Sequence, residues 1–189
     1  MLPIATIICT RKQMSENKVL IALINPKSPT NVGAVMRAAG CFGVDGVLYT
    51  GNRYDRAMKL KTDTKNISAT IPLTGEPDLL DNLSADYSDN DIKVVCIDLI
   101  EGATPLPNFI HPEKALYIFG PEDSTIKQSV VNQADAVVYI PTNSCMNLAA
   151  TVNVVLYDRL AKSTQHVADN ELIKKSRDNN NKVKVKSIL

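Results

Sequence analysis

Short β-branched runs alternate with segments of helical spacing from Lys18 onward, and this alternation constrains the fold more than any other feature of the sequence. Strands are predicted at residues 19–24, 46–49, 93–97, 115–119 and 136–140. Helices are predicted at residues 31–41, 76–83 and 147–161, with a further short helix after the strand 115–119. Such alternation is typical of an α/β domain built around a largely parallel sheet.

The length of 189 residues and the hydrophobic content of 44% suit one domain with a sizeable core. We expect that domain at residues 19–162. Residues 1–18 are interpreted as an N-terminal arm or extra strand, and residues 163–189 as a basic, polar C-terminal tail.

The sequence favours a cytoplasmic protein without a membrane segment or a metal. No apolar stretch approaches the roughly 20 residues that a membrane-spanning helix needs, and the apolar run at the N-terminus precedes its basic residues, the reverse of a secretory signal. Cys9, Cys41 and Cys96 lie among apolar neighbours, as buried thiols in a reducing compartment do. The four cysteines form no CxxC pair and only two histidines accompany them, which argues against a metal site.

Global charge gives no evidence for or against a nucleic-acid partner, because 21 Lys and Arg face 20 Asp and Glu. Local clustering is more informative. The segment 51–66 has no apolar period and is interpreted as a basic surface excursion, and the tail is also basic. The predicted RNA contacts in the excursion are Arg53, Arg56, Lys59, Lys61 and Lys65. The alternative is ordinary solvated charge.

Three unusual loops follow predicted strands, where parallel α/β sheets bind their ligands. The first loop opens the segment Asn25-Pro26-x-x-Pro29-x-Asn31-x-Gly33-Ala34-x-x-Arg37-x-Ala39, with Thr30 or Asn31 as the predicted helix N-cap. The second is Phe119-Gly120-Pro121-Glu122, and the third runs from Ile140-Pro141 to Asn147-Leu148. The first loop lacks the glycine-rich turn of dinucleotide-binding enzymes, which disfavours that class.

Together and in this order, the three segments resemble motifs 1, 2 and 3 of the SpoU-type methyltransferases of the SPOUT superfamily, over about residues 19–160. The resemblance implies S-adenosylmethionine as cofactor, RNA as substrate and a homodimer. It also implies a deep trefoil knot in the C-terminal part of the domain, a feature so rare that no spacing of residues predicts it.

The resemblance assigns the catalytic roles to Asn31, Arg37, Glu122 and Asn147. The family's arginine is proposed as a general base, but a guanidinium stays protonated, so we expect Arg37 to hold a phosphate of the RNA or stabilise a developing alkoxide. Asn31 is expected beside it, where it fixes either the 2′-hydroxyl or Arg37 by hydrogen bonding. Glu122 either orients Arg37, binds a hydroxyl, or is a carboxylate at a helix N-terminus. Asn147 either braces the site or caps a helix.

The adenosine moiety is expected among the second and third loops, where glycine and proline shape tight turns and apolar side chains offer a flat face. The predicted cofactor-binding residues are Phe119, Gly120, Pro121, Glu122, Ile140, Pro141, Thr142, Cys145, Asn147 and Leu148. Two departures from the family pattern affect these loops: Ser124-Thr125 replaces a glycine after Glu122, and Cys145 replaces a serine.

The sequence therefore predicts an enzyme that methylates a ribose 2′-hydroxyl of RNA, with tRNA slightly favoured over rRNA. Two alternatives remain open. One is a non-catalytic RNA-binding protein that retains the fold, and the other is a nucleotide-binding α/β protein with unrelated chemistry.

Overall fold

The computed structural model describes residues 18–58, 71–81, 83, 91–163 and 170–185. Its centre is a seven-stranded sheet in the order β3-β2-β1-β6-β4-β7-β5, and all six neighbouring pairs are parallel. The strands are β1 (Val19–Leu23), β2 (Gly46–Tyr49), β3 (Leu73–Gly75), β4 (Lys93–Ile97), β5 (Thr104–Pro105), β6 (Ala115–Phe119) and β7 (Ala136–Tyr139). The predicted parallel α/β class is confirmed.

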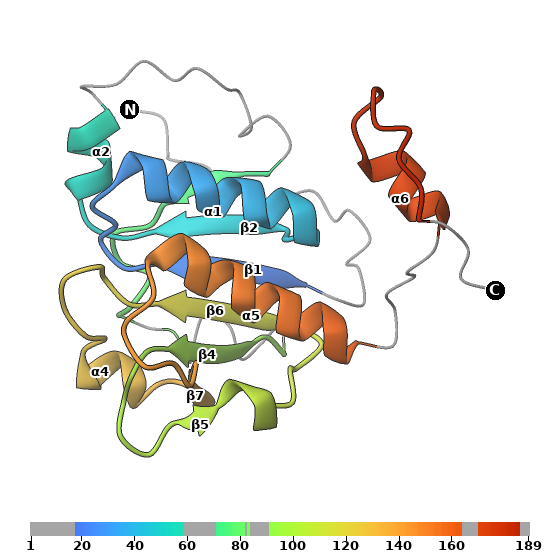
Figure 1. Cartoon of the computed structure of the whole chain (residues 1–189). Helices are drawn as coiled ribbons and strands as arrows, with labels where there is room; N and C mark the ends of the chain where they lie inside the picture. Colours follow the sequence, from blue (N-terminus) through green and yellow to red (C-terminus); the bar gives the residue numbers. More distant parts are fainter. Residues whose placement is uncertain (1–17, 59–70, 82, 84–90, 164–169, 186–189) are drawn as a thin grey trace.

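The helices are α1 (Pro29–Phe42), α2 (Arg53–Met58), the 3-10 helix η2 (Leu106–Asn108), α4 (Gln128–Val131), α5 (Leu148–Lys162) and α6 (Asn170–Ser176). Figure 1 shows α1 and α5 side by side over one face of the sheet. Alternation along β1 sends Ile21 and Leu23 into the core under these helices and Ala22 into the second core on the opposite face. β6, at the centre of the sheet, is buried at every residue.

α1 begins two residues earlier than predicted, so the N-cap prediction is wrong. The hydroxyl of Ser28, not Thr30 or Asn31, accepts a hydrogen bond from the Asn31 N–H, at 3.4 Å. Pro29 fits the first helical position because the N–H that it lacks has no intrahelical partner there. The helix ends at Phe42 and is followed by its C-cap Gly43, whose φ of 67° lies in the left-handed region that favours glycine.

Two segments differ from their predicted structure. The start of the basic excursion forms the short helix α2, while Lys59, Lys61 and Lys65 lie outside the described residues. Residues 77–81, predicted within a helix, form i→i+3 turns, consistent with the turn preference of Asp78 and Asp81. The short strands β3 and β5 escaped prediction because two or three residues are too few for a periodic pattern.

The tail contains the unpredicted helix α6, none of whose side chains is buried and which lies apart from the sheet in Figure 1.

Among the thiols, Cys96 is buried as expected, but Cys41 is exposed, because its position in α1 lies off the buried stripe of that helix. Cys9 lies outside the described residues. No helix in the described part of the chain is long and apolar enough to cross a membrane.

Candidate functional site

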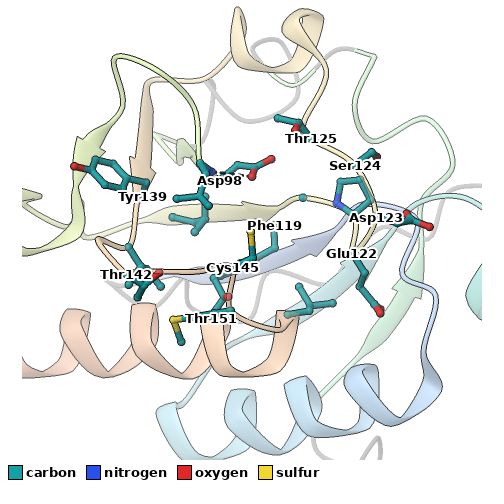
Figure 2. Close-up of a pocket in the computed structure, with 17 residues that line it drawn as sticks. Asp98, Phe119, Glu122, Asp123, Ser124, Thr125, Tyr139, Thr142, Cys145 and Thr151 are labelled. Atoms are coloured by element: carbon teal, nitrogen blue, oxygen red, sulfur yellow. Dashed lines mark hydrogen bonds between the residues drawn. The ribbon is translucent and has the colours of Figure 1, made fainter.

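A cavity of about 370 Å³ opens at the carboxyl ends of β4, β6 and β7. Figure 2 shows the loop after β6, with Glu122, Asp123, Ser124 and Thr125, on one side of this cavity, and Thr142, Cys145 and Thr151 on the other. Its lining is Ile97, Asp98, Leu99, Phe119, Gly120, Pro121, Glu122, Asp123, Ser124, Thr125, Tyr139, Ile140, Thr142, Cys145, Met146, Leu148 and Thr151. We call this cavity the motif pocket.

Eight of the ten predicted cofactor-binding residues line the motif pocket: Phe119, Gly120, Pro121, Glu122, Ile140, Thr142, Cys145 and Leu148. The other two do not. Pro141 is exposed beside the pocket. Asn147 is the N-cap of α5, and its side-chain oxygen accepts from the Ala150 N–H at 2.7 Å. The capping alternative for Asn147 is therefore the one seen, and it fixes where the third loop becomes helix.

Asp98 is a pocket residue that the sequence interpretation missed. Its carboxylate accepts from the backbone N–H groups of Leu99 and Ile126, each at 2.8 Å. Gly120 packs against it so closely that a Cβ there would lie 2.8 Å from Asp98 Oδ2, so a side chain at this position would displace the carboxylate. The carboxyl-end rule applied to the strand 93–97 as well would have pointed to Asp98, its first following residue.

The Asp98–Ile126 hydrogen bond also bears on the two departures from the family pattern. It holds the far end of the loop that contains Ser124 and Thr125, so this loop has a defined path without the family's glycine. Both residues are exposed and line the pocket, as does Cys145.

No group of three or more His, Cys, Asp or Glu among the described residues is placed to hold a metal ion.

Glu122 joins the second loop to the first. Its Oε1 accepts from the backbone N–H groups of Lys27 and Ser28, each at 3.2 Å, immediately before α1. A carboxylate at this place also meets the positive end of the helix dipole. Glu122 thus lies at the N-terminus of α1 and not of the helix that follows it, α4. No hydrogen bond or ion pair connects it with Arg37.

Arg37 is exposed on α1 and makes no hydrogen bond or ion pair with a described residue, so the surface salt-bridge alternative is not seen. Asn31 is partly buried one and a half turns earlier. Asn31 and Arg37 are six residues apart, which in a helix corresponds to about 9 Å along the axis and about 120° around it. The structure does not join them by a hydrogen bond, so the expected Asn31–Arg37 partnership is not present here.

Arg53 forms a bidentate ion pair with Asp123, with N–O distances of 2.9 and 3.0 Å, and so ties α2 to the rim of the motif pocket. The guanidinium lowers the pKa of the Asp123 carboxyl, and Asp123 in turn raises that of Arg53. The positive charge of Arg53, one of the predicted RNA contacts, is therefore already neutralised by Asp123. Arg56, on the same helix, is exposed without an ion pair to a described residue.

A parallel sheet with a pocket of small-molecule size at its carboxyl edge defines an α/β protein that binds a ligand there. The particular family follows from the sequence profile of the SpoU rRNA Methylase family, which matches residues 18–157. The chain belongs to this family, as the three motifs predicted.

Individual relatives agree with this assignment. The chain is 25% identical over 156 residues to a protein named 23S rRNA (guanosine-2'-O-)-methyltransferase RlmB, from Acinetobacter baylyi. That match covers 77% of this chain but only 60% of the relative, so the chain spans about three fifths of its length.

Two solved structures share the fold. The SpoU methyltransferase AviRb from Streptomyces viridochromogenes, in complex with the cofactor AdoMet, has a TM-score of 0.63 at 19% identity, covering 77% of this chain and 57% of AviRb. The A. aeolicus TrmH/SpoU tRNA modifying enzyme has a TM-score of 0.64 at 16% identity, covering 77% of this chain and 74% of that enzyme.

Proposed function

We propose that this protein transfers a methyl group from S-adenosylmethionine to a ribose 2′-hydroxyl of RNA. One observation carries the proposal: residues of motifs 2 and 3, predicted from sequence alone, line one pocket, and Glu122 ties that pocket to motif 1. Family membership and the name of the RlmB relative support the same reaction.

The motif pocket fits the chemistry of S-adenosylmethionine. Ile140 and Leu148 offer apolar contact for an adenine ring, and the loop that begins at Gly120 presents backbone groups to its polar edge. The carboxylates of Asp98 and Glu122, which bind only backbone N–H groups, give the pocket an acidic side, which suits a ligand carrying a sulfonium and an ammonium. The AviRb structure, which contains AdoMet, supports this choice of cofactor.

The cofactor supplies an activated methyl group, so the protein's tasks are to align the 2′-oxygen and to stabilise charge on it. We assign the second task to Arg37, because its exposed guanidinium has no partner among the described residues and is available to RNA. It stabilises the negative charge that develops on the 2′-oxygen, or holds the neighbouring phosphate, while the proton leaves to solvent. Asn31 contributes a hydrogen bond to the ribose, and Glu122 keeps α1 in place.

For the substrate class, we favour tRNA slightly over rRNA. The printed names of relatives include both, an rRNA enzyme and a tRNA modifying enzyme. The proposed RNA contacts are Arg37, Arg56 and the pair-forming Arg53, together with Lys59, Lys61 and Lys65. The basic tail adds positive charge, which favours phosphate binding in general.

Several further features are proposals that rest on the family resemblance. They are the trefoil knot in the C-terminal part of the domain, a homodimer whose partner completes the RNA surface, and a cytoplasmic location. The same holds for the division into an arm at residues 1–18, a catalytic domain at 19–162 and a tail at 163–189.

The test is transfer of labelled methyl groups from S-adenosylmethionine to separate pools of unmodified tRNA and rRNA, followed by nucleoside mass spectrometry. We expect a 2′-O-methylnucleoside from one pool. A base-methylated product contradicts the ribose assignment. If the protein binds RNA but neither binds the cofactor nor transfers methyl groups, it is a non-catalytic RNA-binding protein. If it binds neither cofactor nor RNA, the proposal fails.

A further inference from the structure

A second cavity, of about 500 Å³, lies at the carboxyl ends of β1 and β2. It shares Pro121, Ser124 and Thr125 with the motif pocket, so the loop after β6 is a common wall between the two cavities. Of the ten predicted cofactor-binding residues, Pro121 alone lines this second cavity, and it belongs to the shared wall. We call it the β1–β2 pocket. Whatever occupies it lies next to the ligand of the motif pocket.

The floor of the β1–β2 pocket contains an unusual asparagine. Asn25 has a φ of 43°, in the left-handed region, and its N–H donates to Thr50 Oγ1 at 3.1 Å. Its side chain packs against Gly51, where any Cβ would overlap the amide. Asn25 Oδ1 is buried without a hydrogen-bond partner, the one such side-chain atom found in the described part of the chain. A buried acceptor without a partner is costly, and a turn of the Asn25 amide toward a ligand donor in the pocket relieves that cost.

The rest of the lining combines apolar surface with positive charge. Leu80, Pro121 and Val130 offer apolar contact. Lys127 is exposed at the rim and forms no ion pair with a described residue, and Arg53 is also at the rim, paired with Asp123. Asp81 is the one carboxylate among the lining residues. The apolar residues, the polar floor and the unpaired charge of Lys127 match the base, the base edge and the phosphate of a nucleotide.

We propose that the β1–β2 pocket is a subsite for one unstacked nucleotide of the substrate RNA. Lys127 contacts its phosphate, and the Asn25 amide contacts the edge of its base. Proteins that recognise RNA by sequence read such splayed-out bases on their polar edges. The inference rests on the proposed function for the identity of the RNA, but RNA binding tests it without methyl transfer.

The experiment measures the Kd of fluorescently labelled tRNA and rRNA pools by anisotropy for four forms of the full chain. Ser129→Trp places a large ring in the β1–β2 pocket from an exposed position on α4, and Lys127→Ala removes the rim charge. Gln128→Trp is the matched control, because Gln128 is exposed on the same helix and lines none of the cavities described here. Protection by S-adenosylmethionine against thermal unfolding is measured in parallel.

We expect Ser129→Trp to weaken RNA binding by ~10-fold and Lys127→Ala by ~3-fold, with Gln128→Trp within about twofold of the wild type. Cofactor protection stays unchanged in all variants. RNA affinity of Ser129→Trp equal to that of Gln128→Trp overturns the inference, and so does a wild type that binds no RNA. If the wild type binds RNA and Ser129→Trp loses that binding, while no RNA is ever methylated, the subsite stands and the proposed function fails.

Discussion

The two edges of the sheet use their polar residues in different ways. At the amino edge, three residues near the C-terminal end of α5 contact two residues from outside that helix. We call this group the α5 network: Asp158, Arg159 and Lys162 from α5, with His111 and Tyr117. The two ring nitrogens of His111 lie 2.7 Å from Tyr117 Oη and 2.8 Å from Asp158 Oδ2. Arg159 and Lys162 donate to the backbone carbonyls of Pro112, Glu113, Leu106 and Phe109. These side chains are thus occupied by contacts within the protein.

At the carboxyl edge, Arg53 and Asp123 pair with each other, but other charged groups bind backbone or have no partner. Glu122 and Asp98 hold loops there through N–H groups, and Arg37, further along α1, has no partner among the described residues. The difference indicates a division of labour within one sheet. The α5 network fastens the segment before β6 to α5 and serves stability, whereas the carboxyl edge leaves groups available to ligands.

Replacement of Arg37 with alanine is the strongest test of this division. We expect methyl transfer to fall by ~10³-fold, because an electrostatic contact to the reacting oxygen is lost. Affinity for S-adenosylmethionine stays within a few-fold, since Arg37 does not line the motif pocket. The control is Lys93→Ala at the amino edge, where Lys93 pairs with Asp135. An Arg37→Ala enzyme with full activity removes the catalytic assignment.

Replacement of Arg159 with methionine tests the amino edge. We expect the free energy of unfolding to fall by about 1–3 kcal/mol, because the carbonyls of Pro112 and Glu113 and the Tyr117 hydroxyl lose a donor. Urea titration measures this, and methyl transfer by the folded variant should match the wild type. Lys175→Met, on the exposed helix α6, is the control. A stable Arg159→Met protein with impaired transfer means that the amino edge also serves function.

Replacement of Glu122 with alanine tests whether the carboxyl edge depends on the tie between motifs 1 and 2. We expect the KM for S-adenosylmethionine to rise by ~3- to 10-fold, since two charge-assisted hydrogen bonds to the loop before α1 are lost. Glu113→Ala at the amino edge is the control. An unchanged KM means that the Asp98–Ile126 contact alone fixes the loop.

The smallest expected effect is a pH dependence of stability from His111. Burial lowers the pKa of His111 below 6.5, although the hydrogen bond to Asp158 opposes this shift. The unfolded chain therefore takes up a proton more readily than the folded one, so stability decreases as the pH falls below 6.5. Urea titrations at pH 7 and pH 5 should show a smaller difference for His111→Gln than for the wild type. Equal differences exclude this contribution.

The sequence by itself determined five of the seven strands of the sheet and eight residues of the motif pocket. Three predicted strands, at residues 46–49, 93–97 and 115–119, match the structure residue by residue, because apolar runs between turn residues are local signals. The pocket loops were found for a related reason: parallel strands bring their carboxyl ends to one edge, so the residues after each strand meet.

Only the tertiary structure decided which polar groups pair. Glu122 binds the backbone of Lys27 and Ser28 across more than 90 residues, and Arg53 binds Asp123 across 70. The partner of Asp98 is likewise distant in the chain, the N–H of Ile126, 28 residues further on. A charged side chain can pair with many different groups at nearly equal interaction energy, so no local sequence pattern selects one partner among them. The selection comes from the packed sheet, which fixes which loops lie within hydrogen-bonding distance of one another.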